Sequence, residues 1–436
     1  MLEGYEDYKE TNIPWLSSVP KNWELLKIGE LFTERREKVS DKEYAPLTVG
    51  KMGVVPQLDT VAKSNDGDNR KLVKSGDYVI NSRSDRKGSS GLSSYDGSVS
   101  LINIVLTPRK GNGKYFHYLL KSYYWIEEYY RNGRGIVADL WTTRFSEMKS
   151  IVLPIPTISE QDRIVRYLDC KISMINKNID AKKNQIELLK EQKQAVINRA
   201  VTKGLNFDVS LKDSGIDWLG KIPKHWEVRK LRYFCKFQNG ISESGDFFIT
   251  GTPFVNYTDV YKNFQLPLNV EGKASSTKKQ QELFSVRKGD IFFTRTSETI
   301  GEIAYSSVCF EDIEKAIFSG FLIRVRQRIN KMDLSFAKYY FRSVLSRYYF
   351  CKEMNLVTRV SLGQTLLKNM PVLLPPMEEQ KKIGDYLEST ISKINNLLEN
   401  YEKEIYRINE YQTRLISDVV TGKVNVQGVE VGEVVV

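Results

Sequence analysis

The chain has 436 residues, of which 41% are hydrophobic and 27% charged, the composition of an ordinary globular protein with room for two or three cores. No apolar run reaches the roughly 18 residues that a membrane span needs, and the polar start MLEGYEDYKE is unlike a signal peptide. Four cysteines without paired spacing indicate a reducing, cytoplasmic setting and argue against disulfides or a metal site.

The formal net charge is +11, and 11% of the residues are aromatic. A basic, aromatic-rich surface suits a polyanion, and nucleic acid is the commonest polyanion of the cytoplasm. A basic protein without such a partner can have the same composition, so the charge alone leaves both interpretations open.

The chain contains two tandem copies of one pattern. Eight residues between Ile13 and Lys27 recur 203 positions later, between Ile216 and Lys230. The first members of the pairs are Ile13, Trp15, Leu16, Pro20, Lys21, Trp23, Glu24 and Lys27. A further segment, Pro156 to Leu168, recurs 219 positions later from Pro375 to Leu387, so the second copy has 16 extra residues between its repeated segments. A period this long predicts a duplicated domain rather than a solenoid.

Each block between the repeats is expected to mix strands with one aromatic helix. Runs of β-branched and aromatic residues bounded by Gly and charged turns predict strands at Asp77–Ile80, Leu101–Leu106, Asp290–Thr294 and Phe318–Val325. Aromatic helices are expected at Lys114–Tyr130 and Leu334–Phe350.

A polar, basic loop follows one strand in each block, at residues 81–88 and 294–299. Arg can reach guanine edges, Asn can reach adenine, and Ser and Thr can reach bases or phosphates. The candidate DNA contacts are Asn81, Ser82, Arg83, Ser84, Arg86 and Lys87 in the first block, and Thr294, Arg295, Thr296, Ser297, Lys278 and Lys279 in the second. We expect Lys278, Lys279, Arg324, Arg326 and Arg328 to contact phosphate or solvent rather than bases. A solvated basic loop beside a strand end is the alternative for each loop residue.

Two long helices are predicted at residues 160–204 and in the matching segment of the second copy, because apolar residues recur every 3.5 positions without an interrupting proline. The predicted coiled-coil seam is Leu168, Ile172, Ile175, Ile179, Ile186, Leu189, Leu387, Ile391, Ile394, Leu398, Ile405 and Ile408. Ser159 is the expected N-cap of the first helix. The long intervening block lets the chain return, which favours an antiparallel pair about 60 Å long. Polar residues interrupt the seam at Lys182, Lys193, Tyr401 and Gln412, where they can fix its register. The alternative for the lysines is that their side chains extend to solvent.

Motifs for catalysis are absent from the sequence. It has no GxxxxGK[ST] loop, and Leu374-Pro375-Pro376-Met377 lacks the flanking residues of the [ND]PP[YF] motif of amino-methyltransferases. His117 and His225 are the only histidines, and His117, inside an aromatic helix, is expected to be structural. The sequence therefore predicts a non-catalytic chain without a metal site.

The second copy resembles the specificity (S, HsdS) subunits of type I restriction–modification systems. The resemblance is carried by the segment from Lys212 to Trp226 and by Leu374-Pro375-Pro376 before Glu379, Gln380 and Ile383. It covers the whole chain, although the first copy departs from the opening motif at Asn12 and Ser17-Ser18.

This resemblance implies a mixed α/β protein in which two tandem globular target recognition domains are separated by two long helices that form an antiparallel, pseudo-twofold coiled coil. The expected boundaries are target recognition domains at 1–159 and 206–378, helices at 160–205 and 379–425, and a tail at 426–436. Each domain would read one half of a bipartite double-stranded DNA target, and the coiled coil would set the spacing between the halves.

The resemblance also implies partners. Two adenine-N6 methyltransferase (M) subunits would dock on the chain, and where restriction occurs two motor–nuclease (R) subunits would join them. S-adenosylmethionine, ATP and Mg²⁺ would be used by those partners and not by this chain. The alternatives are a coiled-coil scaffold whose two heads bind protein, and a self-sufficient nuclease or methyltransferase.

Overall fold

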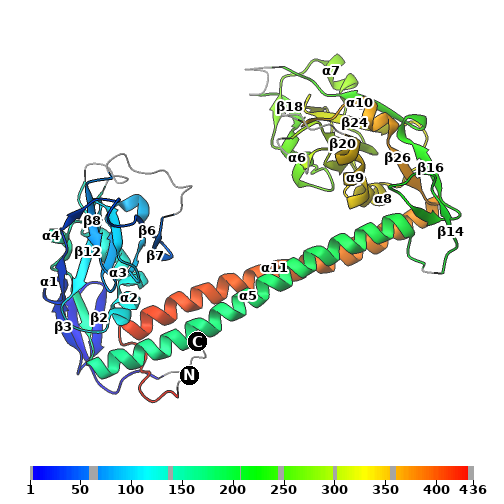
Figure 1. Cartoon of the computed structure of the whole chain (residues 1–436). Helices are drawn as coiled ribbons and strands as arrows, with labels where there is room; N and C mark the ends of the chain where they lie inside the picture. The colour runs from blue at the N-terminus through cyan, green and yellow to red at the C-terminus, as the bar shows by residue number, and fades with distance from the viewer. Residues whose placement is uncertain are drawn as a thin grey trace. The chain divides into compact units, whose positions relative to one another are not determined.

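The structure is a computed structural model that describes residues 3–57, 67–135, 141–206, 208–243, 250–297, 302–353 and 360–430. It divides into two compact units. Unit 1 comprises residues 1–183 and 402–436, and unit 2 comprises residues 184–401. Each unit holds one globular domain, the part of one long helix next to that domain, and the part of the other helix that runs beside it (Figure 1). The predicted domain boundaries lie at the helix ends and stay predictions.

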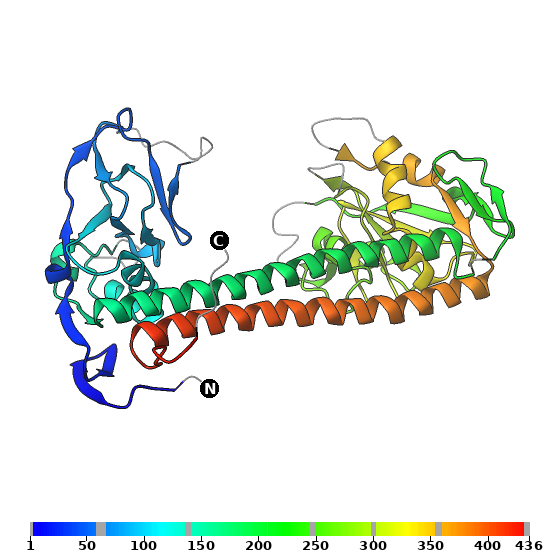
Figure 2. The same cartoon turned by 60° about the horizontal axis from the view of Figure 1, so that its bottom comes forward.

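The long helices α5 (Ile158–Lys203) and α11 (Met377–Val420) are continuous and pair antiparallel within each unit. In unit 1 the Lys182 ammonium pairs with the Glu404 carboxylate. In unit 2 the Lys193 Nζ donates to Asn395 Oδ1 at 2.7 Å, so a later position on α5 meets an earlier one on α11. Figures 1 and 2 show the two helices side by side. The predicted fold class, two α/β domains with an antiparallel coiled coil, is confirmed.

The residues of the predicted seam are shielded from solvent on both long helices. All twelve of its residues are buried or half-buried, from Leu168 at 0% exposure to half-buried Ile408. Burial at a 3.5-residue period supplies the apolar area that holds the pair together. Two of the four polar interruptions, Lys182 and Lys193, bond across to the opposite helix.

The predicted cap of the first helix is wrong. The helix begins at Ile158, so Ser159 lies inside its first turn. Thr157 precedes the helix instead, and its Oγ1 accepts the Glu160 amide at 3.4 Å. At the far ends, Gly204 and Gly422 adopt left-handed φ values of 75° and 77°.

The domain of unit 1 is built around a four-stranded antiparallel sheet in the order β10-β9-β12-β4, accompanied by the sheet β11-β8-β5. Three antiparallel pairs complete it: the hairpins β1-β2 and β6-β7, and the long-range pair β3-β13. Its elements are β1 Tyr8–Ile13, β2 Leu16–Pro20, β3 Glu24–Lys27, α1 Ile28–Leu31, β4 Phe32–Glu34, β5 Lys38–Val39, β6 Leu47–Gly50, β7 Gly53–Pro56, β8 Arg70–Val73, β9 Tyr78–Asn81, η1 Ser84–Arg86, β10 Ser90–Leu92, β11 Gly97–Ser100, β12 Asn103–Pro108, α2 Gly113–Lys121, α3 Tyr123–Arg131, α4 Phe145–Met148 and β13 Val152–Ile155.

The domain of unit 2 repeats this plan, with a four-stranded antiparallel sheet in the order β22-β20-β24-β17. Its elements are β14 Leu211–Asp213, β15 Lys221–Pro223, β16 Glu227–Lys230, η3 Leu231–Tyr233, β17 Cys235–Asn239, β18 Thr252–Val255, α6 Tyr257–Lys262, β19 Lys273–Ala274, α7 Lys278–Leu283, β20 Asp290–Thr294, β21 Thr296–Ser297, β22 Ser306–Val308, β23 Ile317–Phe318, β24 Leu322–Gln327, α8 Leu334–Tyr340, α9 Val344–Glu353, β25 Val360–Ser361, α10 Gln364–Asn369 and β26 Pro371–Leu374. The two four-stranded sheets match strand for strand, so divergent blocks share one central sheet.

Each predicted aromatic helix is in fact two helices. In unit 1 the break is at Ser122, which is extended (φ −66°, ψ 147°) and whose hydroxyl donates to Leu119 O at 2.7 Å. In unit 2 the break is near Ser343, whose hydroxyl donates to Tyr340 O at 2.6 Å. A serine hydroxyl that bonds to a nearby carbonyl competes with helix continuation. The expected strand Phe318–Val325 is likewise two strands, β23 and β24, separated by a turn at residues 319–321.

The repeated segments form the join between domain and helix. The Trp23 indole, fully buried, donates to Glu160 Oε1 at 3.1 Å, and the Trp226 indole donates to Glu379 Oε2 at 3.2 Å. The next residue of each long helix holds a helix cap. Gln161 Oε1 accepts the backbone amide of Asn112, the N-cap of α2, at 2.8 Å. Gln380 accepts the amide of Asp333, the cap of α8, at the same distance.

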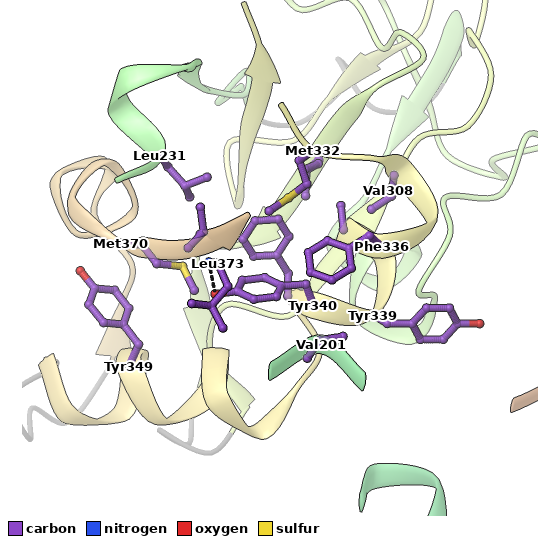
Figure 3. Packing of buried hydrophobic residues seen from close by; sticks show 14 of the residues in the cluster. Val201, Leu231, Val308, Met332, Phe336, Tyr339, Tyr340, Tyr349, Met370 and Leu373 are labelled. Carbon is purple, nitrogen blue, oxygen red and sulfur yellow. Dashed lines mark hydrogen bonds between the residues drawn. The ribbon is translucent and has the colours of Figure 1, made fainter. Parts of the chain in front are cut away.

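The core of unit 2 packs α8 and α9 between β26 and the end of α5. Figure 3 shows Val201 of α5 beside Tyr340, whose hydroxyl accepts the Leu373 amide at 3.0 Å. Tyr340 is fully buried, as are Phe336 and Met370 around it. The long helix is thus part of the hydrophobic core rather than an appendage.

Candidate nucleic-acid interface

A buried aspartate begins the strand that carries each basic loop. Asp77 and Asp290, 2% and 0% exposed, each follow a glycine with left-handed φ and accept the amide of the residue three positions earlier at 2.8 Å. Asp77 also pairs with Arg35 at 2.8 Å. Asp290 pairs with Arg326, and this hydrogen bond raises the pKa of the guanidinium. The ion pairs fix the start of β9 and β20, and so the position at which each strand ends in its loop.

The β9 loop (residues 82–89) presents three cations. The side chains of Arg83, Arg86 and Lys87 are 42%, 67% and 44% exposed. Arg83 and Arg86 lie 3.4 and 3.6 Å from the Asp85 carboxylate, while Lys87 pairs with Glu127 at 2.6 Å. Exposed ion pairs of this kind contribute about 1 kcal/mol or less, so phosphates can compete for these cations.

The backbone of the β9 loop is braced from three sides. The Ser84 amide donates to Trp141 O at 2.9 Å and the Thr143 amide donates to Ser82 O at 3.1 Å. Lys121 Nζ donates to the carbonyls of Lys51 and Gly88 at 2.6 and 3.1 Å. Burial lowers the pKa of this amine to about 8. These braces were not foreseen, because nothing in the linear sequence links residues 121 and 141 with the loop.

Other predicted contacts of the first block are used inside the domain. Asn81 and Ser82 are 8% and 7% exposed. The Ser82 hydroxyl donates to Ile102 O at 2.5 Å, and Asn81 Oδ1 accepts the Arg83 amide at 3.2 Å. Ser84 begins the short η1 helix. The Asn81 and Ser82 side chains shape the loop, while half-buried Ser84 stays a candidate contact beside the three cations.

The β20 loop (residues 295–297, with residues 298 and 299 of the predicted loop outside the described chain) has the same setting in unit 2. Half-buried Arg295 donates its amide to Phe321 O at 2.8 Å, and its carbonyl accepts the Leu362 amide at 2.7 Å. Thr296 and Ser297 form β21, which pairs with β25. The loop is therefore held on both edges, and Arg295 is its cation.

Two predictions for the second block need correction. Thr294 is fully buried and its hydroxyl accepts the Tyr305 amide at 2.9 Å, so it holds the strand end. Arg324, 7% exposed, donates to the carbonyl of Ser285 and to Gln238. Arg326 pairs with buried Asp290. Arg324 is therefore buried and structural, and its predicted exposure to solvent is wrong. Arg326 is 26% exposed, so the predicted solvent contact holds for it beside its structural ion pair.

Lys278 and Lys279 lie on a different element from the β20 loop. Both are exposed at the start of α7, where Thr277 caps the helix by accepting the Gln280 amide at 3.2 Å. Arg328, the last of the three alternating arginines, donates to Arg232 O at 3.0 Å from an exposed position.

Over the described part of the chain, no group of three His, Cys, Asp or Glu side chains is arranged to hold a metal ion. His117 is structural as expected, because its Nδ1 accepts the Leu92 amide at 3.3 Å and burial lowers its pKa to about 4. In the same residues no helix has the length and apolar character that crossing a bilayer requires.

The two matched sheets, each with a basic loop at one strand end and a long helix packed against its domain, define a tandem two-domain protein built around a pair of long helices. The family model described as type I restriction modification DNA specificity domain matches residues 20–188 and 223–407. The chain belongs to this family, which confirms the resemblance stated from the sequence.

Curated relatives agree over most of the length. The chain is 25% identical over 441 residues to the type I restriction enzyme MjaVIII specificity subunit of Methanocaldococcus jannaschii, with 96% of this chain and 97% of the relative covered. It is 24% identical over 337 residues to the EcoBI specificity subunit of Escherichia coli, with 75% and 69% covered.

Solved structures share the fold. One, described as the structural basis of complex assembly and conformational transition of the type I R-M system, has a TM-score of 0.70 at 14% identity and covers 92% of this chain and 98% of its own. The HsdS subunit from Thermoanaerobacter tengcongensis has a TM-score of 0.52 at 16% identity, with 93% and 98% covered.

Proposed function

We propose that this chain is the DNA-reading subunit of a type I restriction–modification complex, in which each globular domain reads one half of a bipartite target. The observation that carries the proposal is the repeated placement of a braced cationic loop at the same strand end of two matching sheets. Arg83, Arg86 and Lys87 serve the first domain, and Arg295 serves the second. Divergent loops on one frame suit two different half-sites.

We further propose that the helices set the spacing of the half-sites. With 46 and 44 residues, α5 and α11 span about 69 and 66 Å at about 1.5 Å per residue. This exceeds one helical turn of DNA, about 34–36 Å. The cross-helix contacts of Lys182 and Lys193 support a fixed register.

Partner docking is proposed for the outer faces of the helices. Large apolar side chains are exposed there, with Met174 at 56%, Leu188 at 64%, Tyr406 at 64% and Tyr411 at 55%. Buried in an interface, such residues supply affinity, and aromatic rings are enriched at interfaces. We propose that two adenine methyltransferase subunits dock on these faces. These subunits would bind S-adenosylmethionine, and any motor–nuclease subunits would bind ATP and Mg²⁺, so that this chain binds none of the three.

The test is reconstitution. The chain alone, the methyltransferase subunit alone and the complex are each incubated with S-adenosylmethionine and random-sequence duplex DNA, and modified adenines are mapped. The proposal expects methylation by the complex alone, at two half-sequences separated by a constant gap. Methylation by this chain alone would overturn the non-catalytic assignment. If the complex forms but neither binds nor methylates DNA, a protein-binding scaffold is favoured instead.

A further inference from the structure

In both units the basic loop is joined through its backbone to an exposed apolar residue. After the last ladder pair of unit 1, Asn81 with Asn103, the Ser82 amide donates to Ile102 O at 3.4 Å. After the last ladder pair of unit 2, Thr294 with Leu322, the Arg295 amide donates to Phe321 O at 2.8 Å. Ile102 and Phe321 therefore occupy the same position of the shared sheet.

These two positions differ from the strands that they precede. Ile102 is 42% exposed and Phe321 is 60% exposed, whereas Ile104 and Leu322 on β12 and β24 are 3% and 0% exposed. The blocks barely resemble one another in sequence, yet both place an apolar side chain in solvent beside the loop. A single exposed apolar residue needs no explanation. Exposed apolar residues at equivalent positions of two divergent domains do need one.

Each apolar residue sits on a backbone that holds it firmly. The Phe321 amide donates to Ser319 Oγ at 3.2 Å, and the preceding Gly320 donates to Ile241 O at 2.7 Å. A Cβ on Gly320 would lie 2.1 Å from Ser242 Oγ and 3.1 Å from Ile241 O, so a larger residue at this position would have to displace the Ser242 side chain. In unit 1 the Asn103 Nδ2 donates to Ser100 O at 3.0 Å across the turn that carries Ile102.

We propose that Ile102 and Phe321 are wedges that enter the base stack of DNA, one in each half-site. The inference rests on the proposed function. Proteins that insert apolar side chains between base steps also place arginines in the groove beside the wedge. Here Arg295 is itself the bonded loop position of unit 2, and Arg83 directly follows the bonded position, Ser82, of unit 1. The backbone link fixes how far each wedge projects from its loop.

The probe is duplex DNA that carries the bipartite sequence recovered by methylation mapping, with 2-aminopurine substituted at one position at a time. Each duplex is bound to the complex of the full chain with its methyltransferase subunit. The wedge predicts a fluorescence increase at one step in each half-site, because unstacked 2-aminopurine is brighter. Phe321→Ala should abolish the increase in one half only and weaken binding about tenfold or more. Ile102→Ala should do the same in the other half.

Two variants control the test. Phe321→Leu keeps an apolar wedge and should retain most of the affinity. Ile329→Ala removes a side chain of similar exposure, 56%, beyond the opposite end of β24 and should bind as the unaltered chain does. Thermal melting should be unchanged in all of them, since the side chains are exposed.

Three results would contradict the wedge. Phe321→Ala that binds with unchanged affinity and unchanged fluorescence overturns it and leaves the proposed function intact. Loss of methyltransferase binding by Phe321→Ala with DNA contacts unchanged assigns the residue to a protein interface. Absence of sequence-specific binding by the unaltered complex contradicts the proposed function first and the wedge with it.

Discussion

The indole nitrogen of Trp23 donates to the Glu160 carboxylate at 3.1 Å, across 137 positions of sequence. The same bond joins Trp226 and Glu379 at 3.2 Å. The tryptophan comes from the first repeated segment and the glutamate from the second, so the two repeats meet at one contact. This contact explains why both segments recur: together they attach a domain to the start of its long helix.

Removal of this contact should destabilise unit 1. Glu160 is 5% exposed and also accepts from Tyr5 OH at 2.7 Å, so Glu160→Ala leaves two donors without their acceptor. We expect a loss of about 1–3 kcal/mol in the free energy of unfolding, measured by urea denaturation. Glu187→Ala, at an exposed ion pair with Lys190 on the same helix, should cost about 0.5 kcal/mol or less. Equal effects of the two variants would contradict this role of Glu160.

The stability of unit 1 should fall as the pH is lowered from 7 to 4. Burial lowers the pKa of His117 from 6.5 to about 4, with Lys121 adding to the effect. In this window the unfolded chain binds a proton at His117 and the folded chain does not, so acid favours unfolding, by as much as about 3 kcal/mol. His117→Asn keeps an acceptor for the Leu92 amide and should show a shallower pH dependence in thermal melts. Parallel pH profiles for the two proteins would contradict the shifted pKa.

The exposed cations should contribute to DNA binding through phosphates. Arg86→Ala should weaken binding by the complex and lower the slope of log K against log salt by about 1. Arg414→Ala is the matched control, since its side chain is 85% exposed on α11. Titrations at several salt concentrations measure both slopes. An unchanged slope for Arg86→Ala would remove the β9 loop from the interface.

The helices should act as a ruler. Insertion of one heptad into both helices, after Lys183 and before Glu402, preserves the seam and adds about 10 Å. The spacer between the half-sites should lengthen by as much as about three base pairs, while the half-sites themselves are unchanged. A heptad in α5 alone should disrupt pairing and lower the thermal melting temperature. A spacer that stays constant after the double insertion would contradict the ruler.

Much of the frame was predictable because its determinants are local. The apolar residues at a 3.5-residue period predicted both helices and their seam, and the repeats predicted two domains. The breaks at Ser122 and Ser343 were missed, since a serine is tolerated within a helix and only its bond to a carbonyl in the preceding turn shows the break.

The candidate site was predicted less well, because the role of a polar side chain depends on its tertiary partners. The sequence does not show that Arg326 forms an ion pair with buried Asp290, 36 positions earlier. Thr294 was predicted to contact DNA, but its hydroxyl accepts the backbone amide of Tyr305 inside the domain. Phe321 was not chosen because it falls inside the predicted strand Phe318–Val325, where an aromatic residue is expected in the core. Only its 60% exposure separates it from its neighbours.

The central claim, that each domain reads its own half of a divided target, is tested most directly by mapping N6-methyladenine after methylation by the complex of Arg295→Ala and of the unaltered chain. The unaltered complex should modify two half-sequences at a constant separation, and Arg295→Ala should relax the sequence preference in one half while the other stays the same. A single contiguous sequence, or relaxation of both halves together, would contradict the account.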